Sequence, residues 1–348
     1  MEYLKEQFNI ELQTESNTYI DEGRIHIREM HWSPDEMLGL IDENVYDQIL
    51  NEWFDERKQN YLQIADEILE KYDNRDRYES LKETFQEGVV IPFIGAGMSI
   101  SSNYPGWKDY LRKVCSETRV DLSQLNKLMA TGKYEEAAQL LFDDMGAASF
   151  NEHLKITFSR KREIKGPVNY LPKIFNSGVI TTNFDSLLER TYADQGLKFE
   201  EIMLGNSASE FPRLAATGKP FLLKLHGHAN RQRDRVLTFA EYEAAYSEKA
   251  VLRTLVSHTF FAKTMLFMGC SLSSDRTLKL MADYVEEFGH ENLPQHYAIV
   301  NLHESEDRIA RREQLVAANI FPIWYESSDH DEAIEALLLD LVDGNIKI

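Results

Sequence analysis

The sequence has little cysteine and no long apolar run. Its two cysteines, Cys115 and Cys270, cannot build a disulfide framework or a four-cysteine zinc site. No apolar run approaches the roughly 18 residues that a membrane-spanning helix needs. The first residues also lack the basic and apolar regions of a secretory signal. We therefore expect a cytoplasmic protein that binds no metal and does not enter a membrane.

Positive charge is also scarce. The 348 residues include 38 lysines and arginines against 58 aspartates and glutamates, which gives a formal net charge of −20. Because nucleic-acid binding depends mainly on basic side chains that neutralise phosphates, we do not expect direct binding of nucleic acid. The length and a hydrophobic content of 43% suffice for one large domain with an accessory region.

The acidic residues are concentrated near the N-terminus. Residues 1–80 contain 21 aspartates and glutamates but only 8 lysines and arginines. Within them, Ser33-Pro34-Asp35-Glu36 is typical of a helix start, with Ser33 as the N-cap and Glu36 closing a capping box. No catalytic pattern is present here. We expect an acidic helical region, which either packs as an arm on the main domain or serves docking or oligomerisation.

Strand and helix patterns alternate in the rest of the chain. Seven short apolar segments predict strands: 89–94, 178–182, 198–204, 220–225, 264–268, 295–302 and 320–325. Helical patterns separate them, so we predict an α/β fold with a doubly wound, Rossmann-like parallel sheet and right-handed crossovers. This domain is expected to cover residues 81–348, with a helical insertion at about 105–170.

The first of these strands ends in a glycine turn. Gly95-Ala96-Gly97 follows it, and Ser99 leads into a helical segment. A strand that breaks on glycines and enters a helix presents backbone N–H groups to an anion, and glycine lets a diphosphate approach the backbone closely. The third glycine of the dehydrogenase fingerprint is missing, because Ile100 occupies that position. Taken alone, the motif is equally typical of a tight turn that binds nothing.

Three further strands end in polar or glycine-rich tips. These tips are Thr182-Asn183-Phe184-Asp185, Leu225-His226-Gly227 and Gly269-Cys270-Ser271-Leu272. Ligands of open α/β sheets bind at the carboxyl ends of the strands, so the four tips are expected to converge. In the alternative interpretations, His226 is bonded to a neighbouring loop, Asn183, Asp185 and Ser271 are helix caps, and Cys270 fills the core.

A basic loop follows the histidine tip. It contains Arg231, Arg233 and Arg235 together with Asp234. We interpret this mixed loop as a solvated one, since charges of both signs are interspersed in it. A contact with a phosphate is the alternative.

The order of these motifs resembles the sirtuin-like NAD-consuming family. It is most similar to one branch, the sirtuin-like NAD hydrolases of bacterial antiphage defence. The following segments carry the resemblance: Thr181-Thr182-Asn183-Phe184-Asp185, Lys224-Leu225-His226-Gly227, Val236-Leu237-Thr238 with Glu241-Tyr242, and Gly269-Cys270-Ser271-Leu272 with Asp275-Arg276-Thr277-Leu278. The resemblance covers roughly residues 85–345, and the combination is more specific than any single motif.

The resemblance implies a role for each matching residue. It implies that the diphosphate and the adjacent ribose are held by Gly95, Ala96, Gly97 and Ser99. It implies that His226 is the catalytic residue and that Asn183, with Asp185 as its acidic companion, positions the nicotinamide ribose or a water. It places the adenosine side at Gly269, Ser271 and Leu272. Histidine suits a base in this reaction because its reference pKa of about 6.5 is close to working pH.

The sequence also departs from the protein-deacylating sirtuins. Those proteins carry two cysteine pairs that bind zinc, which this chain cannot supply, and the helical insertion takes the place of the zinc module. Their Pro-Asp-Phe-Arg stretch is Pro105-Gly106-Trp107-Lys108 here, which puts acyl-lysine chemistry in doubt. Water then becomes the acceptor. The resemblance thus implies an NAD⁺ glycohydrolase that yields nicotinamide and ADP-ribose, with NAD⁺ as substrate and no metal.

Two other functions remain open at this point. One is a protein ADP-ribosyltransferase or deacylase, and the other is a non-catalytic module that binds NAD⁺ or ADP-ribose. For the hydrolase, unregulated loss of NAD⁺ would kill the host, so its activity is expected only when infection triggers it. The resemblance implies a homo-oligomer that assembles with a separately encoded activator or sensor, such as a HerA-type ATPase.

Overall fold

The computed structural model describes residues 2–15, 25–27, 30–41, 43–205, 208, 219–273, 276–303, 306–327 and 329–346. The chain forms two compact units. One is Met1–Glu67 with Glu335–Ile348, and the other is Ile68–Ile334. The functional division into residues 1–80 and 81–348 stays a prediction. Asp275, part of the motif after the fourth tip, lies outside the described residues.

The first unit is mainly helical. It contains α1 (Glu2–Glu15), the antiparallel strands β1 (Ile25–Ile27) and β2 (Met30–Trp32), α2 (Pro34–Ile41), most of α3 (Glu43–Leu69) and the later part of α16 (His330–Leu341). The predicted capping box is confirmed. The Ser33 N–H donates to Glu36 Oε2 at 2.9 Å, and the Glu36 N–H donates to Ser33 Oγ at 3.4 Å. The sequence patterns did not indicate the short hairpin.

A buried carboxylate lies inside this first unit. Glu335 is only 1% exposed, and it accepts a hydrogen bond from the Tyr3 hydroxyl at 3.3 Å. The Arg57 guanidinium approaches it to 3.6 Å. In the same unit, the Phe8 ring packs edge-on against Tyr46, with ring centroids 5.5 Å apart. The charged group is therefore buried together with a cation, as buried charges require.

The second unit is built on a seven-stranded sheet. Its strands are β3 (Val90–Ile94), β4 (Gly178–Thr181), β5 (Glu201–Leu204), β6 (Phe221–Lys224), β7 (Thr264–Met268), β8 (His296–Asn301) and β9 (Ile320–Tyr325). They are ordered β5-β6-β4-β3-β7-β8-β9, and every neighbouring pair is parallel. The predicted α/β fold with a Rossmann-like parallel sheet is confirmed. The order reverses at β3, because the chain first builds outward through β4 and later returns to pair β7 with β3.

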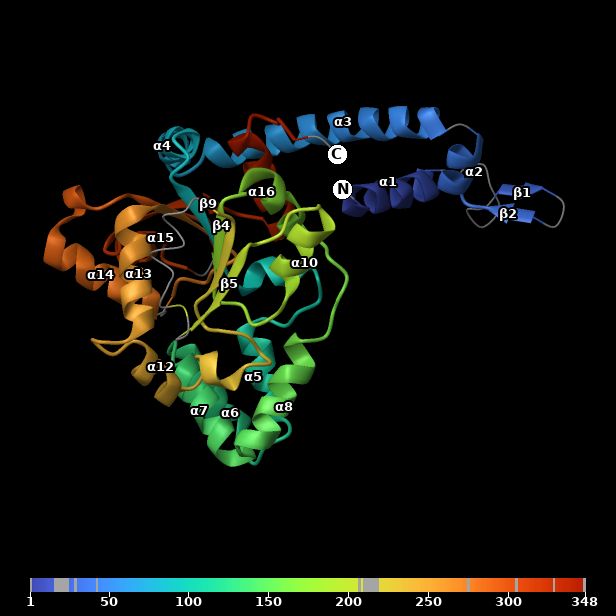
Figure 1. Cartoon of the computed structure of the whole chain (residues 1–348). Coiled ribbons are helices and arrows are strands. Elements are labelled where there is room, and N and C mark those ends of the chain that lie inside the picture. The colour runs from blue at the N-terminus through green and yellow to red at the C-terminus, as the bar shows by residue number, and fades with distance from the viewer. Residues whose placement is uncertain are drawn as a thin grey trace. The chain divides into compact units, whose positions relative to one another are not determined.

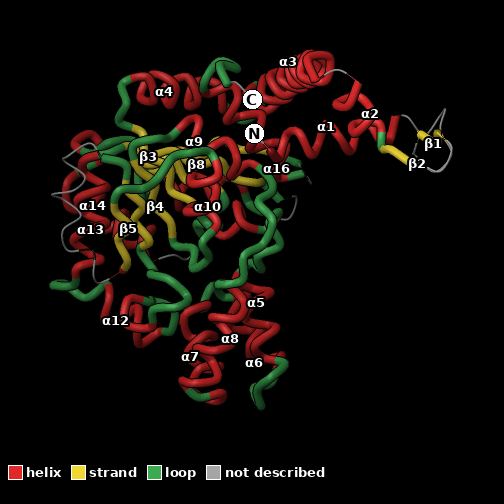
Figure 2. The backbone as a smooth tube through the Cα atoms, turned by 45° about the vertical axis from the view of Figure 1, so that its right-hand side comes forward, coloured by secondary structure: helices red, strands yellow, loops and turns green. Residues whose placement is uncertain are grey.

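The second unit also contains helices. They are α4 (Asn74–Gln86), α5 (Trp107–Cys115), α6 (Leu122–Ala130), α7 (Tyr134–Met145), α8 (Ala147–Phe158), α9 (Leu171–Ile174), α10 (Leu187–Asp194), α12 (Phe239–Ala245), α13 (Val251–Ala262), α14 (Arg276–Phe288), α15 (Arg308–Val316) and the start of α16. Short 3₁₀ segments occupy Ala96–Ser99, Pro167–Tyr170, Gln232–Asp234 and His290–Asn292. Figures 1 and 2 both show α13 and α14 on one side of the sheet and α10 on the other.

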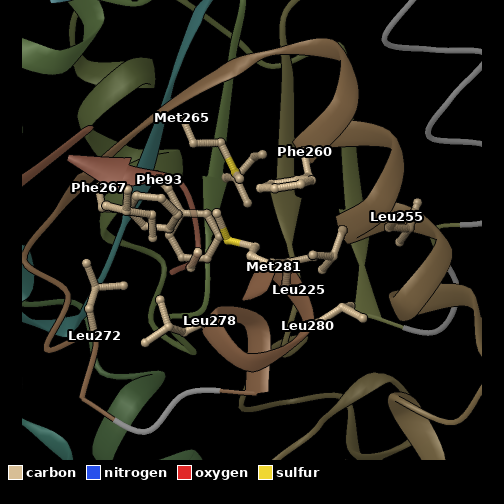
Figure 3. Close-up of a cluster of buried hydrophobic side chains, with 14 of the residues drawn as sticks. Phe93, Leu225, Leu255, Phe260, Met265, Phe267, Leu272, Leu278, Leu280 and Met281 are labelled. Atoms are coloured by element: carbon tan, nitrogen blue, oxygen red, sulfur yellow. The ribbon is translucent and has the colours of Figure 1, made fainter. Parts of the chain in front are cut away.

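Large apolar side chains fill the space between the sheet and α13 and α14. The rings of Phe93 and Phe267, on the paired strands β3 and β7, have centroids 4.7 Å apart. Figure 3 shows these rings gathered with Met265 and Met281, and Phe260 of α13 lies close by. Burial of this apolar area is the main stabilising contribution to such a core. It fixes the central strands whose ends carry the polar tips.

The helical insertion lies between β3 and β4, where the sequence predicts it. Helices α5, α6, α7 and α8 lie together next to α12 in both views (Figures 1 and 2). The Trp107 ring at the start of α5 packs edge-on against Phe184 of the β4 tip, at 5.3 Å between centroids. An aromatic contact therefore joins the insertion to a strand end.

The outer edge of β9 is covered by side chains of α4. Asn74 is fully buried, and its Nδ2 donates to the carbonyl of Trp324 at 2.8 Å. Its Oδ1 accepts from the Trp324 N–H at 2.9 Å. Arg77 donates to the Pro322 carbonyl at 2.9 Å. These side chains satisfy backbone groups that a neighbouring strand would otherwise pair.

A neutral histidine is buried at the start of β8. His296 has no exposed surface, its Nδ1 accepts from the Met265 N–H at 3.0 Å, and its ring stacks on Phe260 at 4.7 Å. Burial lowers the pKa of His296 to about 3. In the unfolded chain, a histidine has a pKa of about 6.5. Between about pH 3 and pH 6.5, His296 is therefore protonated in the unfolded chain but neutral in the folded chain.

Acidification should therefore destabilise the fold through His296. Below pH 6.5 the free energy of unfolding should fall by about 1.4 kcal/mol per pH unit from this group, because the depressed pKa leaves the proton on the unfolded state alone. Urea denaturation of wild type and His296→Asn between pH 7 and pH 4 measures the slope. The variant should show a shallower slope, whereas the exposed His258→Asn should keep the wild-type slope. Equal slopes for all three proteins would contradict the assignment.

Candidate functional site

The polar tips lie in a row along one edge of the sheet. The strand order places the ends of β6, β4, β3, β7, β8 and β9 side by side. Neighbouring strands are about 4.8 Å apart, so the row extends for roughly 24 Å. His226 follows β6 at one end, and the Gly95 and Gly269 turns follow β3 and β7 in the middle. The tip of β9 ends the row at Tyr325.

A cavity of about 950 Å³ runs along this row. Its size lies within the range of about 300–1,000 Å³ that is typical of ligand sites. Seven of the predicted site residues line it: Gly95, Ala96, Gly97, His226, Gly269, Ser271 and Leu272. The lining also includes residues of the insertion and of the β8 and β9 tips. Ser99, Asn183 and Asp185 are not among the lining residues.

The two glycine turns pack backbone against backbone. The Gly95 N–H donates to the Met268 carbonyl at 2.9 Å, and the Gly97 N–H donates to the Gly269 carbonyl at 2.8 Å. A Cβ on Gly95 would lie 2.4 Å from the Gly269 oxygen, and Gly269 itself has a φ of +66°. Glycine is needed here because the turns touch. The N–H of Ala96, at the cavity wall, has no partner among the described residues.

Asn183 supports the glycine turn from behind. Its Nδ2 donates to the Gly95 carbonyl at 3.0 Å and to Ser99 Oγ at 3.2 Å, and both side chains are buried. Thr182, next to it, lines the cavity. The structure thus brings Asn183 and Ser99 together with the turn, but the Asn183 amide is directed at protein atoms and not at His226.

Asp185 lies deeper in the same cluster. Its Oδ1 accepts from the Leu187 N–H at 2.9 Å, which is the helix-capping contact of the alternative interpretation. Burial raises the pKa of the Asp185 carboxyl, although Lys224 and the Ser99 hydroxyl act in the opposite direction. Lys224 is 1% exposed, donates to the Asp185 carbonyl and pairs with Glu189 at 2.9 Å. Asp185 is therefore a structural neighbour of the site in this conformation.

His226 has a hydroxyl at each ring nitrogen. Its Nε2 lies 3.1 Å from the Tyr246 hydroxyl and its Nδ1 lies 3.3 Å from the Tyr242 hydroxyl. The two tyrosine rings stack with centroids 5.9 Å apart. Tyr246 is bonded in turn to Thr277 Oγ1 at 3.2 Å. In the alternative interpretation His226 bonds to a neighbouring loop. The ring bonds instead to Tyr242 of α12 and to Tyr246 at the C-terminal cap of that helix, and it also lines the cavity.

Sequence reasoning missed this tyrosine pair. Tyr242 was noticed only within the family motif, and Tyr246 was not singled out. The sequence contains a signal for this pair. Thr238 and Glu241 have the spacing of a capping box, which starts a helix, and Tyr242 and Tyr246 are four residues apart, so they share one face of that helix. The Thr238 and Glu241 capping box is present in the structure and begins α12.

The basic loop is not solvated throughout, so that interpretation is wrong for two of its residues. Arg235 is buried, where it donates to Asn151 and pairs with Glu241 at 2.6 Å. Asp234 is buried as well, and its carbonyl lies 2.2 Å from where a Cβ on Gly227 would be. The loop therefore packs on the His226 turn and on the helical insertion.

The far end of the cavity has a different chemical character. Asn301 at the end of β8 and His330 line it, with Nδ2 and Nδ1 of these residues 3.3 Å apart. Burial raises the pKa of the neighbouring Tyr325 to about 12. Burial also raises the pKa of the Asp331 carboxyl, which accepts a hydrogen bond from Ser101 beyond the glycine turn. These polar groups suit a second sugar or base.

Within the described ranges, no three histidine, cysteine or acidic side chains are placed to hold a metal ion together. In the same part of the chain, no helix is both long enough and apolar enough to cross a bilayer. Cys270 is half-buried and lines the cavity, and its Sγ contacts the Phe93 carbonyl at 3.7 Å.

Comparisons with known proteins show what the chain is similar to. Residues 177–323 match the family described as SIR2-like domain. The chain is similar to an NAD(+) hydrolase ThsA of Acinetobacter baumannii, with 24% identity over 66% of this chain and 46% of the relative. It is similar to an NAD(+) hydrolase ThsA of Cytobacillus dafuensis, with 25% identity over 56% and 37%. It also resembles Defense-associated sirtuin 2 of Bacillus subtilis, with 23% identity over 60% and 20%.

The comparisons confirm the resemblance to sirtuin-like NAD hydrolases of antiphage defence. The chain spans less than half the length of these curated relatives. The association with a HerA-type ATPase stays a prediction.

Replacing Gly95 should damage the site, whereas replacing a second cavity glycine should not. Gly95→Ala places a methyl group against the Gly269 carbonyl and should lower the free energy of unfolding by about 1–3 kcal/mol, as overpacking does. Gly106 lines the same cavity, but a Cβ there meets nothing within 4 Å. Gly106→Ala should cost less than about 1 kcal/mol. Urea denaturation compares the two variants, and equal losses would contradict the contact between the turns.

Proposed function

We propose that this chain is an NAD⁺ glycohydrolase, which cleaves NAD⁺ to nicotinamide and ADP-ribose. One observation carries the proposal. His226, the paired glycine turns and the polar β8 and β9 tips follow one another in a row along the same cavity. A dinucleotide has the same order of parts: a base and sugar, a diphosphate, then a second sugar and base. The names of the similar proteins support NAD⁺ as the substrate.

In the proposed pose the diphosphate lies over the glycine turns. There it meets the Ala96 N–H at the start of the 3₁₀ segment, for which the described part of the chain provides no backbone acceptor. The nicotinamide ribose then extends toward His226 and Thr182, and the adenosine extends toward Ser271, Leu272 and the β8 tip. Gly97 and Gly269 allow this approach because they add no side chain at the turns.

The reaction breaks the bond between the ribose C1′ and the nicotinamide nitrogen. The bonding electron pair leaves with nicotinamide, and a water oxygen forms the new bond to C1′. The water proton goes to a ring nitrogen of His226, which acts as general base. Asn183 takes part as a positioning residue, because it holds the Gly95 turn and Ser99 through its amide. A positioned base of this kind typically contributes about 10²- to 10⁴-fold to the rate.

We also propose a role in antiphage defence, in which the activated protein depletes NAD⁺ in the cytoplasm and causes abortive infection. The name of one relative, Defense-associated sirtuin 2, supports this role. In this proposal the chain forms a homo-oligomer with a separately encoded activator such as a HerA-type ATPase. The acidic residues 1–80 would supply the docking or oligomerisation surface, and residues 81–348 the catalytic domain.

Removal of the general base should slow turnover strongly. His226→Ala should lower kcat for nicotinamide release by about 10²- to 10⁴-fold. Asn183→Ala should also lower it, because the glycine turn loses two hydrogen bonds. Chromatography of nicotinamide and ADP-ribose, with and without the activator, measures these rates.

The neighbouring His228 provides a matched control. It is half-buried, does not line the cavity, and burial lowers its pKa to about 4. His228→Asn should keep a turnover close to wild type. Wild-type rates in both His226→Ala and Asn183→Ala would contradict the proposal. Tight NAD⁺ binding without turnover under every activating condition would favour the non-catalytic module, and transfer of label to protein would favour the transferase.

The assembly proposal has its own test. We expect native mass measurement to find more than one copy per particle, and we expect NAD⁺ turnover to rise when the activator is added. The wild type and a variant that lacks residues 1–67 are both measured with and without the activator. Residues 1–67 are chosen because they form most of the first unit. A monomer that is fully active by itself would contradict this proposal without affecting the glycohydrolase assignment.

A further inference from the structure

The two hydroxyls beside His226 lie in different surroundings. Tyr246 is 8% exposed, is absent from the lining of the cavity, and has Thr277 as a further partner at 3.2 Å. Tyr242 is less buried and lines the cavity beside His226. One ring nitrogen therefore faces a buried relay of hydroxyls, and the other faces a hydroxyl at the cavity wall.

The ring of Tyr242 is itself held in place. The Arg276 guanidinium lies 5.7 Å from the centroid of the Tyr242 ring. Arg276 donates to Glu135 of α7 at 2.8 Å and also pairs with Glu243 of α12. Because Glu135 belongs to the helical insertion, the insertion contacts the arginine that packs on the tyrosine. The position of Tyr242 thus depends on side chains from three helices.

Two arrangements of protons satisfy these contacts, because each hydroxyl can donate or accept, and one of the two leaves the basic nitrogen at the cavity wall. In that arrangement, the Nε2–H of His226 donates to Tyr246, and the Tyr246 hydroxyl donates to Thr277 Oγ1. Nδ1 then carries the lone pair, to which the Tyr242 hydroxyl donates. A hydrogen bond to one ring nitrogen decides which nitrogen stays basic. In this arrangement the basic nitrogen is the one at the cavity wall.

We propose that Tyr246 is a positioning residue that fixes the tautomer of His226, and that the Tyr242 hydroxyl covers the basic nitrogen until substrate displaces it. This inference rests on the glycohydrolase proposal and assigns opposite effects to two adjacent tyrosines. Loss of the Tyr246 hydroxyl weakens the base. Loss of the Tyr242 hydroxyl removes a hydrogen bond that exists only before the attacking water arrives. A contact made only in the ground state slows the reaction.

The test is a pair of tyrosine-to-phenylalanine variants in the full chain. Tyr246→Phe should lower kcat for nicotinamide release about 2- to 10-fold with little change in KM, the range of one hydrogen bond. Tyr242→Phe keeps the ring beneath Arg276 and should raise kcat/KM by about 2- to 10-fold. Tyr192→Phe is the matched control. It removes a buried hydrogen bond of 2.6 Å to the Phe175 carbonyl away from the cavity, and should leave both constants unchanged.

A second readout requires no turnover. Nitrogen NMR of histidine-labelled protein, with the His226 signals assigned by their loss in His226→Gln, reports which ring nitrogen carries the proton. We expect the Nε2–H form in wild type, in Tyr192→Phe and in Tyr242→Phe, and a mixture of both tautomers in Tyr246→Phe.

The two readouts separate the possible failures. A wild type that shows the expected tautomer but no turnover would contradict the glycohydrolase proposal and leave the tautomer assignment supported. Unchanged His226 signals in Tyr246→Phe would overturn the positioning role of Tyr246. A fall in kcat/KM for Tyr242→Phe would overturn the covering role of Tyr242.

Discussion

The contact between the β3 and β7 turns is the constraint on which the rest of the site depends. Gly95 and Gly97 donate to backbone carbonyls of the β7 end, and Gly269 adopts a conformation that favours glycine. The sheet reverses its strand order at this point, so the two turns are neighbours although Gly269 follows Gly95 by 174 positions in the chain. Asn183 then bonds to the same turn from the β4 side. The middle of the cavity is therefore made of backbone, and its shape tolerates no added side chain.

The row of strand ends explains why several weak motifs combine into one site. Each tip alone is compatible with an ordinary turn or cap. The parallel sheet places all of them on one edge, with the histidine two strands away from the glycine turns. The sheet itself is fixed by apolar side chains such as Phe93 and Phe267, which do not line the cavity. Packing on the faces of the sheet thus determines the order of polar groups along its edge.

The sequence predicted the sheet and the lining of the cavity better than it predicted side-chain directions. Apolar segments located the strands. β5 starts at Glu201 and not at residue 198, whereas the bounds of the other strands lie within about one residue of the expected ones. The glycine turns and His226 were found because the four tips were expected to converge at one edge of the sheet and because their order resembles a known family. The direction of the Asn183 amide was not predictable, since its partners come from β3, 88 residues away. The burial of Arg235 escaped for the same reason, because Asn151 and Glu241 lie on other elements.

The covered edge of β9 has a consequence for how copies of the chain can associate. Asn74 occupies the N–H and the carbonyl of Trp324, and Arg77 occupies the carbonyl of Pro322, whose nitrogen has no hydrogen to donate. An incoming strand would find these backbone groups already bonded. Extension of the sheet from one molecule into the next along this side would first require α4 to detach. The fold therefore guards this border against the strand-by-strand growth that leads to fibrils.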